Sequence, residues 1–258
     1  MALSQSEIDE MAETLYAAYD EKEPVEPLSN DAEFTTEEAY EIQAKVFDKI
    51  SDGGTLGHKL GLVSEAKQEQ LGIPEPIFAP VVEETVLDGE PVPTEDMIAP
   101  RIEAEIGLVL GEDLEPPVRP MDVVTATDAV VPVVEILESR YQGWSIPSAQ
   151  DVIADLTSAG KVVLGESAKD VSEVDLVMES IAVSVNGEVQ ASGIGGDIMG
   201  NPARAVAWLA NRLEAEGKSI DAGELVMTGG IPAAIDIEPG DVYDIEFANI
   251  GSIRVRAE

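Results

Sequence analysis

The feature that most constrains this chain is a pair of glutamates inside an otherwise apolar β-type segment, residues 101–110. Successive side chains of a strand point to opposite faces, so Glu103 and Glu105 share one face. A second apolar segment, residues 130–140, carries Glu135. Burying carboxylates without a cation costs several kcal/mol per charge, and a hard divalent ion such as Mg²⁺ offsets that cost by accepting oxygen ligands. The pattern predicts a metal site at these three glutamates, against the alternative that Glu-x-Glu recurs by chance in an acidic chain.

Composition narrows the class of protein. With 258 residues, 44% of them hydrophobic, the chain can form one large globular domain, or one domain with an appendage. The formal charge of -37, from 52 acidic and 15 basic residues, argues against nucleic acid and against an anionic membrane surface as partners. A mean hydropathy of +0.02 argues against a disordered acidic chain, so the charge indicates a folded, salt-adapted (halophilic) surface.

Cysteine is absent, which excludes disulfides and thiol catalysis. The chain shows neither the basic and apolar regions of a signal peptide nor an apolar run of about 18 residues, as a membrane helix would need. A cytoplasmic location is therefore expected.

Two amphipathic helices are predicted near the N-terminus. Residues 4–20 begin with Ser4 and Glu7, which have the spacing of a capping box. Thr35 and Glu38 repeat that spacing at the start of a second helix. We interpret residues 1–54 as a helical cap that packs on the rest of the chain or is exchanged with it.

Residues 55–258 are predicted to form a β-rich catalytic domain, because short β-branched segments alternate with glycine and proline. The Asn186-Gly187 pair predicts a two-residue hairpin, and Glu238–Asp241 predicts a turn. One helix is expected in this region, capped by Asn201 and ending at Gly217. The predicted strand segments are 81–87, 102–110, 129–137, 161–165, 176–190, 224–228 and 242–256.

Lys59 lies in an apolar segment bracketed by glycines, in a chain with eight lysines. A lysine in such a place either extends its ammonium to solvent, which is the more ordinary outcome, or is held inside to pair with an anion. His58, the only histidine, would point to the opposite face of a strand and is interpreted as a surface or supporting residue. No nucleophilic triad can be assembled without a second histidine or a cysteine.

Two glycine-rich segments differ in how well they suit ligand binding. Residues 192–200 fail the dinucleotide fingerprint, because Ile198 stands where glycine or alanine is needed and a hairpin precedes the segment. Thr228-Gly229-Gly230 follows an apolar run and would place a hydroxyl and backbone amides at a strand end. This second segment is suited to a substrate carboxylate, or it is a simple turn.

Four motifs, taken in order, carry a resemblance to a known family. They are Gly-x-Lys-x-Gly-Leu at 57–62, Pro-Arg-Ile-Glu-Ala-Glu-Ile at 100–106, Val-Pro-Val-Val-Glu-Ile-Leu-Glu-Ser-Arg-Tyr at 131–141 and Met-Thr-Gly-Gly-Ile at 227–231. Over nearly its whole length the chain resembles the fumarylacetoacetate hydrolase superfamily. Within it, the chain is similar to the branch of 2-oxopent-4-enoate hydratase and 4-oxalocrotonate (2-oxo-3-hexenedioate) decarboxylase, enzymes of meta-cleavage aromatic degradation.

The resemblance implies an α+β fold with mixed β-sheets or a β-roll, a small 2-oxo acid as substrate, and Mg²⁺ or Mn²⁺ as cofactor. It implies a homo-oligomer and, for a decarboxylase, assembly with a sister hydratase. The implied roles fall on metal ligands Glu103, Glu105 and Glu135, catalytic Lys59, and substrate-binding Leu60, Ser158, Thr228 and Gly229.

Finer features resemble the decarboxylases. Hydratases tend to carry aspartate at the position of Ile77. The chain also departs from the pattern of the branch at two places. It has Asp155-Leu-Thr-Ser-Ala159 in place of Asp-Asn-Ala-Ser-Ser, and Asn201 in place of histidine. The expected activity is decarboxylation of 2-oxo-3-hexenedioate to 2-hydroxypenta-2,4-dienoate. The alternatives are a 2-hydroxypenta-2,4-dienoate hydratase, an acylpyruvate-type hydrolase, and a non-catalytic scaffold subunit.

Overall fold

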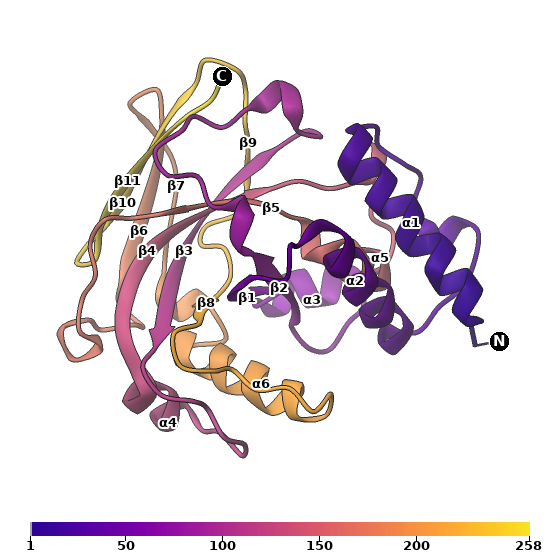
Figure 1. Ribbon diagram of the computed structural model, residues 1–258. Helices are drawn as coiled ribbons and strands as arrows, with labels where there is room; N and C mark the ends of the chain where they lie inside the picture. Colours follow the sequence, from indigo (N-terminus) through magenta and orange to yellow (C-terminus); the bar gives the residue numbers. More distant parts are fainter. Residues whose placement is uncertain (1) are drawn as a thin grey trace.

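Two β-sheets flanked by helices make up the described chain, residues 2–258 of a computed structural model (Figure 1). The larger sheet has the strand order β2-β1-β8-β3-β4-β5, with β9 paired to β3. Within it β1 and β8 run parallel, whereas β3 and β4 are antiparallel, so the sheet is mixed. Its strands are β1 (Thr55–Gly61), β2 (Ile77–Val82), β3 (Arg101–Leu110), β4 (Thr127–Leu137), β5 (Ala159–Leu164), β8 (Leu225–Met227) and β9 (Ile235–Asp236).

The smaller sheet has the order β11-β10-β6-β7. It lies on one side of the long strands β3 and β4, and the N-terminal helices lie on the other side (Figure 1). Its strands are β6 (Ser180–Val185), β7 (Glu188–Ile194), β10 (Val242–Phe247) and β11 (Gly251–Arg256). The mixed sheets with helices confirm the predicted β-rich α+β class.

Six α-helices are present in residues 2–258: α1 (Gln5–Glu21), α2 (Thr36–Ile50), α3 (Glu65–Leu71), α4 (Pro120–Ala126), α5 (Ala149–Ala154) and α6 (Pro202–Glu214). Both predicted capping boxes form, with the Ser4 and Thr35 hydroxyls accepting from backbone N–H groups three residues on. Asn201 caps α6 as predicted, accepting from the backbone N–H of Ala203 at 2.9 Å. None of the helices in the described chain has the length and apolar character needed to cross a membrane.

The two larger of three hydrophobic clusters in the described chain organise these elements. One lies between the two sheets and α6, and it contains Ile106, Val134, Leu209 and Ile245. The other joins α1 and α2 to β2 and α5. The buried side chain of Gln43 on α2 donates to the carbonyls of Phe78 (3.0 Å) and Ile153 (2.7 Å), which ties the N-terminal helices to β2 and α5. The division of the chain at residue 54 stays a prediction.

Most predicted strands are present, and the 186–187 hairpin turn forms with positive φ angles at Asn186 (51°) and Gly187 (85°). The expectation of one helix after residue 55 was wrong, because α3, α4 and α5 also form. Helices of six or seven residues span less than two turns, too short for a 3.6-residue periodicity to be recognised.

Two strand predictions also need correction, and the strands β1 and β9 were not predicted. The strand predicted at 81–87 lies earlier, at β2, and a 3₁₀ turn follows it at Glu83–Thr85. The segment predicted from 176 begins at Ser180, because the Asp175 carboxylate accepts from the backbone N–H groups of the next turn. The glycine-rich β1 was not among the predicted strands.

Candidate metal centre and adjoining cavity

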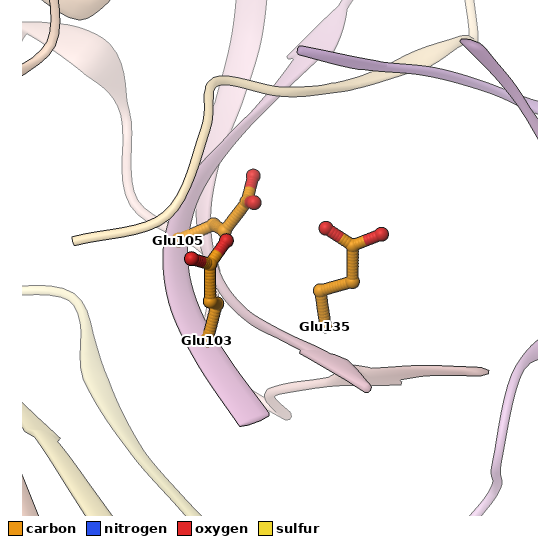
Figure 2. Close-up of side chains that lie close together, drawn as sticks. All are labelled: Glu103, Glu105 and Glu135. Atoms are coloured by element: carbon orange, nitrogen blue, oxygen red, sulfur yellow. The ribbon is translucent and has the colours of Figure 1, made fainter. Parts of the chain in front are cut away.

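Antiparallel pairing of β3 and β4 brings the three glutamates together. Glu103 lies directly opposite Glu135 in the strand register, and Glu105 lies two residues further along the same face of β3. Each carboxylate offers one oxygen that lies within 4.8 Å of an oxygen of both others. Figure 2 shows Glu103 and Glu105 rising from one strand and Glu135 facing them, with all three carboxylates reaching into the same space.

Two of the three glutamates are buried, and protein groups do not satisfy all of their oxygens. Glu105 is 0% exposed and Glu135 is 1% exposed. One oxygen of Glu105 accepts from the backbone N–H of Gly229 at 2.8 Å, whereas Glu105 Oε1 and Glu135 Oε2 have no hydrogen-bond partner within residues 2–258. Buried acceptors without partners are costly and uncommon in folded proteins. Three convergent carboxylates with free oxygens are the hard donor set that Mg²⁺, Mn²⁺ or Ca²⁺ takes, so these residues fit a divalent cation.

The electrostatics of the cluster also favour a bound cation. Burial raises the pKa of Glu105 well above its ordinary value, and the nearby charges of Glu135 and Glu103 raise it further. Burial also raises the pKa of Glu135, opposed by the charge of Lys59. A divalent cation among the carboxylates would oppose these shifts and keep all three groups ionised.

Lys59 is held inside the protein, so the more ordinary expectation of an ammonium extended to solvent was wrong. The residue is 2% exposed, its Nζ lies 2.5 Å from Glu135 Oε1, and it donates to the carbonyl of Thr157 at 2.7 Å. The cause is the position of β1, which is an interior strand between β2 and β8. A countercharge and a carbonyl replace the water that the ammonium loses.

His58 lies on the opposite face of β1, as the alternation of a strand predicts. It is 9% exposed rather than a surface residue, and its Nδ1 lies 3.5 Å from a carboxylate oxygen of Glu224. His58 does not line the cavity beside the glutamates.

A left-handed turn supports Lys59 from the other side. Leu156, Thr157 and Ser158 have φ angles of 50°, 53° and 56°, a conformation that costs L-residues roughly 1–2 kcal/mol each. The turn presents the Thr157 carbonyl to Lys59 and brings Ser158 to the cavity wall. Consecutive non-glycine residues persist in this region of backbone space only where the surrounding structure holds them.

The buried pair of Arg140 and Asp155 holds that turn. The Arg140 guanidinium donates to the Asp155 carboxylate, to the Asp155 carbonyl at 2.5 Å and to the Ala159 carbonyl at 2.7 Å. The hydroxyl of Thr157 donates to the carbonyl of Phe78 at 3.2 Å. These contacts anchor the turn on both sides and place its carbonyl next to the glutamate cluster.

A cavity of about 380 Å³ adjoins the glutamate cluster, within the size range of small-molecule sites. Of the predicted substrate-binding residues, Leu60 and Ser158 line it. Thr228 and Gly229 do not. The hydroxyl of Thr228 donates to the carbonyl of Ile106 at 2.8 Å, and the backbone N–H of Gly229 donates to Glu105.

Sequence reasoning missed several residues of the site. Gly230 lies so close to Glu103 that a Cβ there would collide with the carboxylate. Lys67, Arg101 and Trp144 also line the cavity. Arg101 belongs to the same motif as the glutamates, so its position before Glu103 was the available signal, whereas Lys67 and Trp144 carry no local pattern.

Comparisons with known proteins give one matching family model and several similar relatives. Residues 56–257 match the family model described as "Fumarylacetoacetate (FAA) hydrolase C-terminal". The chain is 36% identical to a 2-keto-4-pentenoate hydratase of Paraburkholderia xenovorans (strain LB400), covering 97% of this chain and 94% of that protein. It is 34% identical to a 4-oxalocrotonate decarboxylase of Pseudomonas sp. (strain CF600), covering 98% of each.

A solved structure extends the likeness to the whole fold. The 4-oxalocrotonate decarboxylase from Pseudomonas putida G7, complexed with magnesium and adipate, superimposes with a TM-score of 0.95 at 34% identity. The match covers 99% of both chains.

Proposed function

Since the chain belongs to the fumarylacetoacetate hydrolase family, we propose that it is a divalent-metal-dependent carbon–carbon lyase that decarboxylates 2-oxo-3-hexenedioate to 2-hydroxypenta-2,4-dienoate. The observation that carries the proposal is the buried cluster of Glu103, Glu105 and Glu135 with two unpartnered oxygens beside a cavity. The similar relatives include both decarboxylases and hydratases, so family membership supports a lyase and leaves the reaction to be argued from the cavity.

In the proposed site the three glutamates hold Mg²⁺ or Mn²⁺. The bound ion supplies Lewis acidity toward the carboxylate and keto oxygens of a 2-oxo acid. The backbone N–H of Gly229 fixes one oxygen of Glu105, and the small Gly230 leaves room for the Glu103 carboxylate. Lys59 holds Glu135 and lines the cavity, so its ammonium lies where negative charge developing on the substrate is stabilised.

The proposed reaction needs no external nucleophile. The distal carboxylate of 2-oxo-3-hexenedioate is vinylogous to that of a β-keto acid. When the bond between C5 and C6 breaks, its electron pair moves through the C3=C4 alkene to the keto oxygen, which takes up a proton, and carbon dioxide leaves. The protein's tasks are to orient the dianion and to stabilise the charge that reaches the keto oxygen, and Lys59 is the residue assigned to both.

The composition of the cavity wall favours decarboxylation over hydration. Ile77 is 0% exposed and lines the cavity, at the position where hydratases tend to carry aspartate. Glu103, already assigned to the metal, is the only acidic residue lining the cavity in the described chain. Adding water at C4 requires a group that positions the water and transfers its proton, and beyond the metal-site Glu103 this wall offers no carboxylate for that role. The hydratase relatives keep that reaction as the rival function.

Product identification tests the proposal. The protein is incubated with Mg²⁺ and either 2-oxo-3-hexenedioate or 2-hydroxypenta-2,4-dienoate, and the products are identified by mass spectrometry. We expect carbon dioxide and the dienoate from the first substrate. Formation of a 4-hydroxy-2-oxo acid from the second, without decarboxylation of the first, would establish a hydratase. If neither substrate is turned over in a divalent-dependent reaction, the chain is assigned the role of a non-catalytic scaffold subunit.

Four further properties stay predictions: the homo-oligomer, the assembly with a sister hydratase, the salt adaptation and the cytoplasmic location.

A further inference from the structure

We propose that Lys67 and Arg101 bind the distal carboxylate of the substrate and thereby select 2-oxo dicarboxylates over 2-oxo monocarboxylates. This inference rests on the proposed function, because it assumes that the 2-oxo end of the substrate binds at the glutamate cluster. It assigns substrate selection to two residues outside that cluster.

The charge of the cavity wall is the reverse of the charge of the chain. Acidic residues outnumber basic ones by 52 to 15 in the sequence. The charged residues that line the cavity are instead three basic ones, Lys59, Lys67 and Arg101, and one acidic one, Glu103. A cavity lined in this way concentrates anions in an otherwise anion-repelling protein.

The three basic side chains lie at different depths. Lys59 is 2% exposed and is already paired with Glu135. The side chains of Lys67 and Arg101 are 38% and 34% exposed, so they lie nearer to solvent. A substrate whose 2-oxo end lies at the buried cluster extends its other end toward these two residues.

Arg101 is pre-oriented for an anion. Its guanidinium stacks over the Trp144 ring at 4.3 Å, and its Nε donates to Asp236 at 2.7 Å. Among the described residues, Nε is the only nitrogen of this guanidinium that donates a hydrogen bond, which leaves the two terminal nitrogens for a ligand. A planar guanidinium held in this way recognises a carboxylate with geometric specificity.

Lys67 comes from a different element, the short helix α3, and its Nζ lies 3.2 Å from Glu103 Oε1. When a divalent cation neutralises Glu103, the ammonium becomes available to a second anion. Three carboxylates of the cluster, one divalent cation and three basic side chains sum to two positive charges, and the exposed Asp236 beside Arg101 offsets part of one of them. The second carboxylate of a dicarboxylate therefore meets a cationic wall, which a monocarboxylate leaves without an anion.

A matched ligand pair tests the inference by isothermal titration calorimetry at saturating Mg²⁺. The saturated compounds 2-oxohexanedioate and 2-oxohexanoate share the 2-oxo acid end and differ only in the distal carboxylate. For the wild type we expect the dicarboxylate to bind at least about tenfold more tightly, the usual scale of a charge-assisted hydrogen bond. Lys67→Met and Arg101→Gln should each reduce this ratio, and the double variant should bring it close to one.

Lys49→Met is the matched control. The Lys49 side chain is 37% exposed and pairs with Glu13 at 2.6 Å, away from the cavity, so the variant removes the same charge from a similar environment. Its affinity ratio should equal that of the wild type. Partly exposed ion pairs contribute little to stability, and Lys67→Met alone carries the test if Arg101→Gln does not fold.

The outcomes separate this inference from the proposed function. If neither ligand shows Mg²⁺-dependent binding, the proposed function itself fails. If both bind with Mg²⁺ but equally tightly, or if the double variant keeps the wild-type ratio, the distal-carboxylate assignment is overturned and the metal site stands.

Kinetics supply a second readout. The distal carboxylate leaves as neutral carbon dioxide, so its contact with Lys67 is stronger in the ground state than in the transition state. With 2-oxo-3-hexenedioate, Lys67→Met should therefore raise KM without lowering kcat. A lower kcat with unchanged KM would contradict a role in substrate selection.

Discussion

The glutamate cluster and the Arg140–Asp155 pair are both buried, and they differ in how their charges are satisfied. Asp155 accepts from the guanidinium and backbone N–H of Arg140 and from the hydroxyl of Ser139 at 3.2 Å. In the glutamate cluster, Glu105 and Glu135 each keep one buried oxygen without a partner among residues 2–258. The first network is complete and fixes the backbone, whereas the second leaves two buried oxygens free for a ligand.

The two regions also differ in the pKa shifts of their buried carboxyl groups. Burial raises the pKa of Asp155 to about 6 against the opposing effect of Arg140, so this carboxylate is ionised at neutral pH. Burial and like charges raise the pKa of Glu105 with no comparably placed cation of its own. The comparison predicts opposite responses when one charge is removed from each region.

The largest expected effect follows from removing the cation of the satisfied pair. Arg140→Met leaves the Asp155 carboxylate buried and unpaired, so the free energy of unfolding should fall by about 3–5 kcal/mol. Denaturant titration at constant salt measures this. The double variant Arg140→Met/Asp155→Leu should recover much of the loss. A loss below about 1 kcal/mol in the single variant would mean that the pair does not hold the turn.

A smaller effect is expected at Lys59, which connects the two regions through Glu135 and the Thr157 carbonyl. If its ammonium stabilises charge made in the transition state, Lys59→Met should lower kcat and kcat/KM together by about 100-fold, the scale of losing one electrostatic stabiliser. Mg²⁺ affinity should stay near the wild-type value. Steady-state kinetics at saturating Mg²⁺ measure this, and activity within twofold of wild type would give Lys59 a structural role only.

The next effect has the opposite sign to that at Arg140. Without metal, Glu105→Gln should be more stable than the wild type by on the order of 1 kcal/mol at alkaline pH, because the amide needs no countercharge. The pKa of Glu105 is raised in the folded state, so its carboxyl contributes to the free energy of unfolding while it is protonated. This contribution is lost as pH rises through the raised pKa. The advantage of the variant should therefore be absent at acid pH and grow with pH. Denaturant titrations in chelator across pH measure it, and a constant difference would contradict the raised pKa.

The smallest effect concerns the surface. Molar KCl shortens the Debye length to roughly 3 Å and relieves repulsion among exposed carboxylates, so the melting temperature should rise, by about 2–4 °C for each kcal/mol gained. Glu105→Gln should show the same rise as the wild type, because salt screens buried charges far less. Thermal unfolding followed by circular dichroism measures both proteins. A melting temperature that is flat or falls with KCl would refute the salt-adapted surface.

Much of the fold was predictable from local sequence. Apolar, β-branched segments identified β3 and β4, and the capping residues of α1, α2 and α6 marked where those helices begin. The grouping of Glu103, Glu105 and Glu135 was also predictable, because two glutamates share a strand face and the third lies in the next long apolar segment. The short helices α3 and α5 were missed because their lengths leave no periodic signal.

The rest of the site depends on tertiary structure. The burial of Lys59 follows from the parallel pairing of β1 with β8, which joins segments far apart in the chain. The left-handed turn at 156–158 has no glycine to indicate it and is held by Arg140. Lys67 and Trp144 reach the cavity from separate elements, and no spacing in the sequence links them to the glutamates.

The central claim is that the unsatisfied glutamate cluster binds a divalent cation, and calorimetric titration of Mg²⁺ into the metal-free protein tests it most directly. We predict one ion per chain in the wild type and an affinity at least about tenfold weaker in Glu105→Gln, which keeps the shape of the side chain but removes a ligand charge. Glu179→Gln is the matched control, because Glu179 is also 0% exposed but its oxygens accept hydrogen bonds from Asn249. It should titrate like the wild type. Identical Mg²⁺ titration curves for the wild type and Glu105→Gln, or no binding by either, would contradict the account.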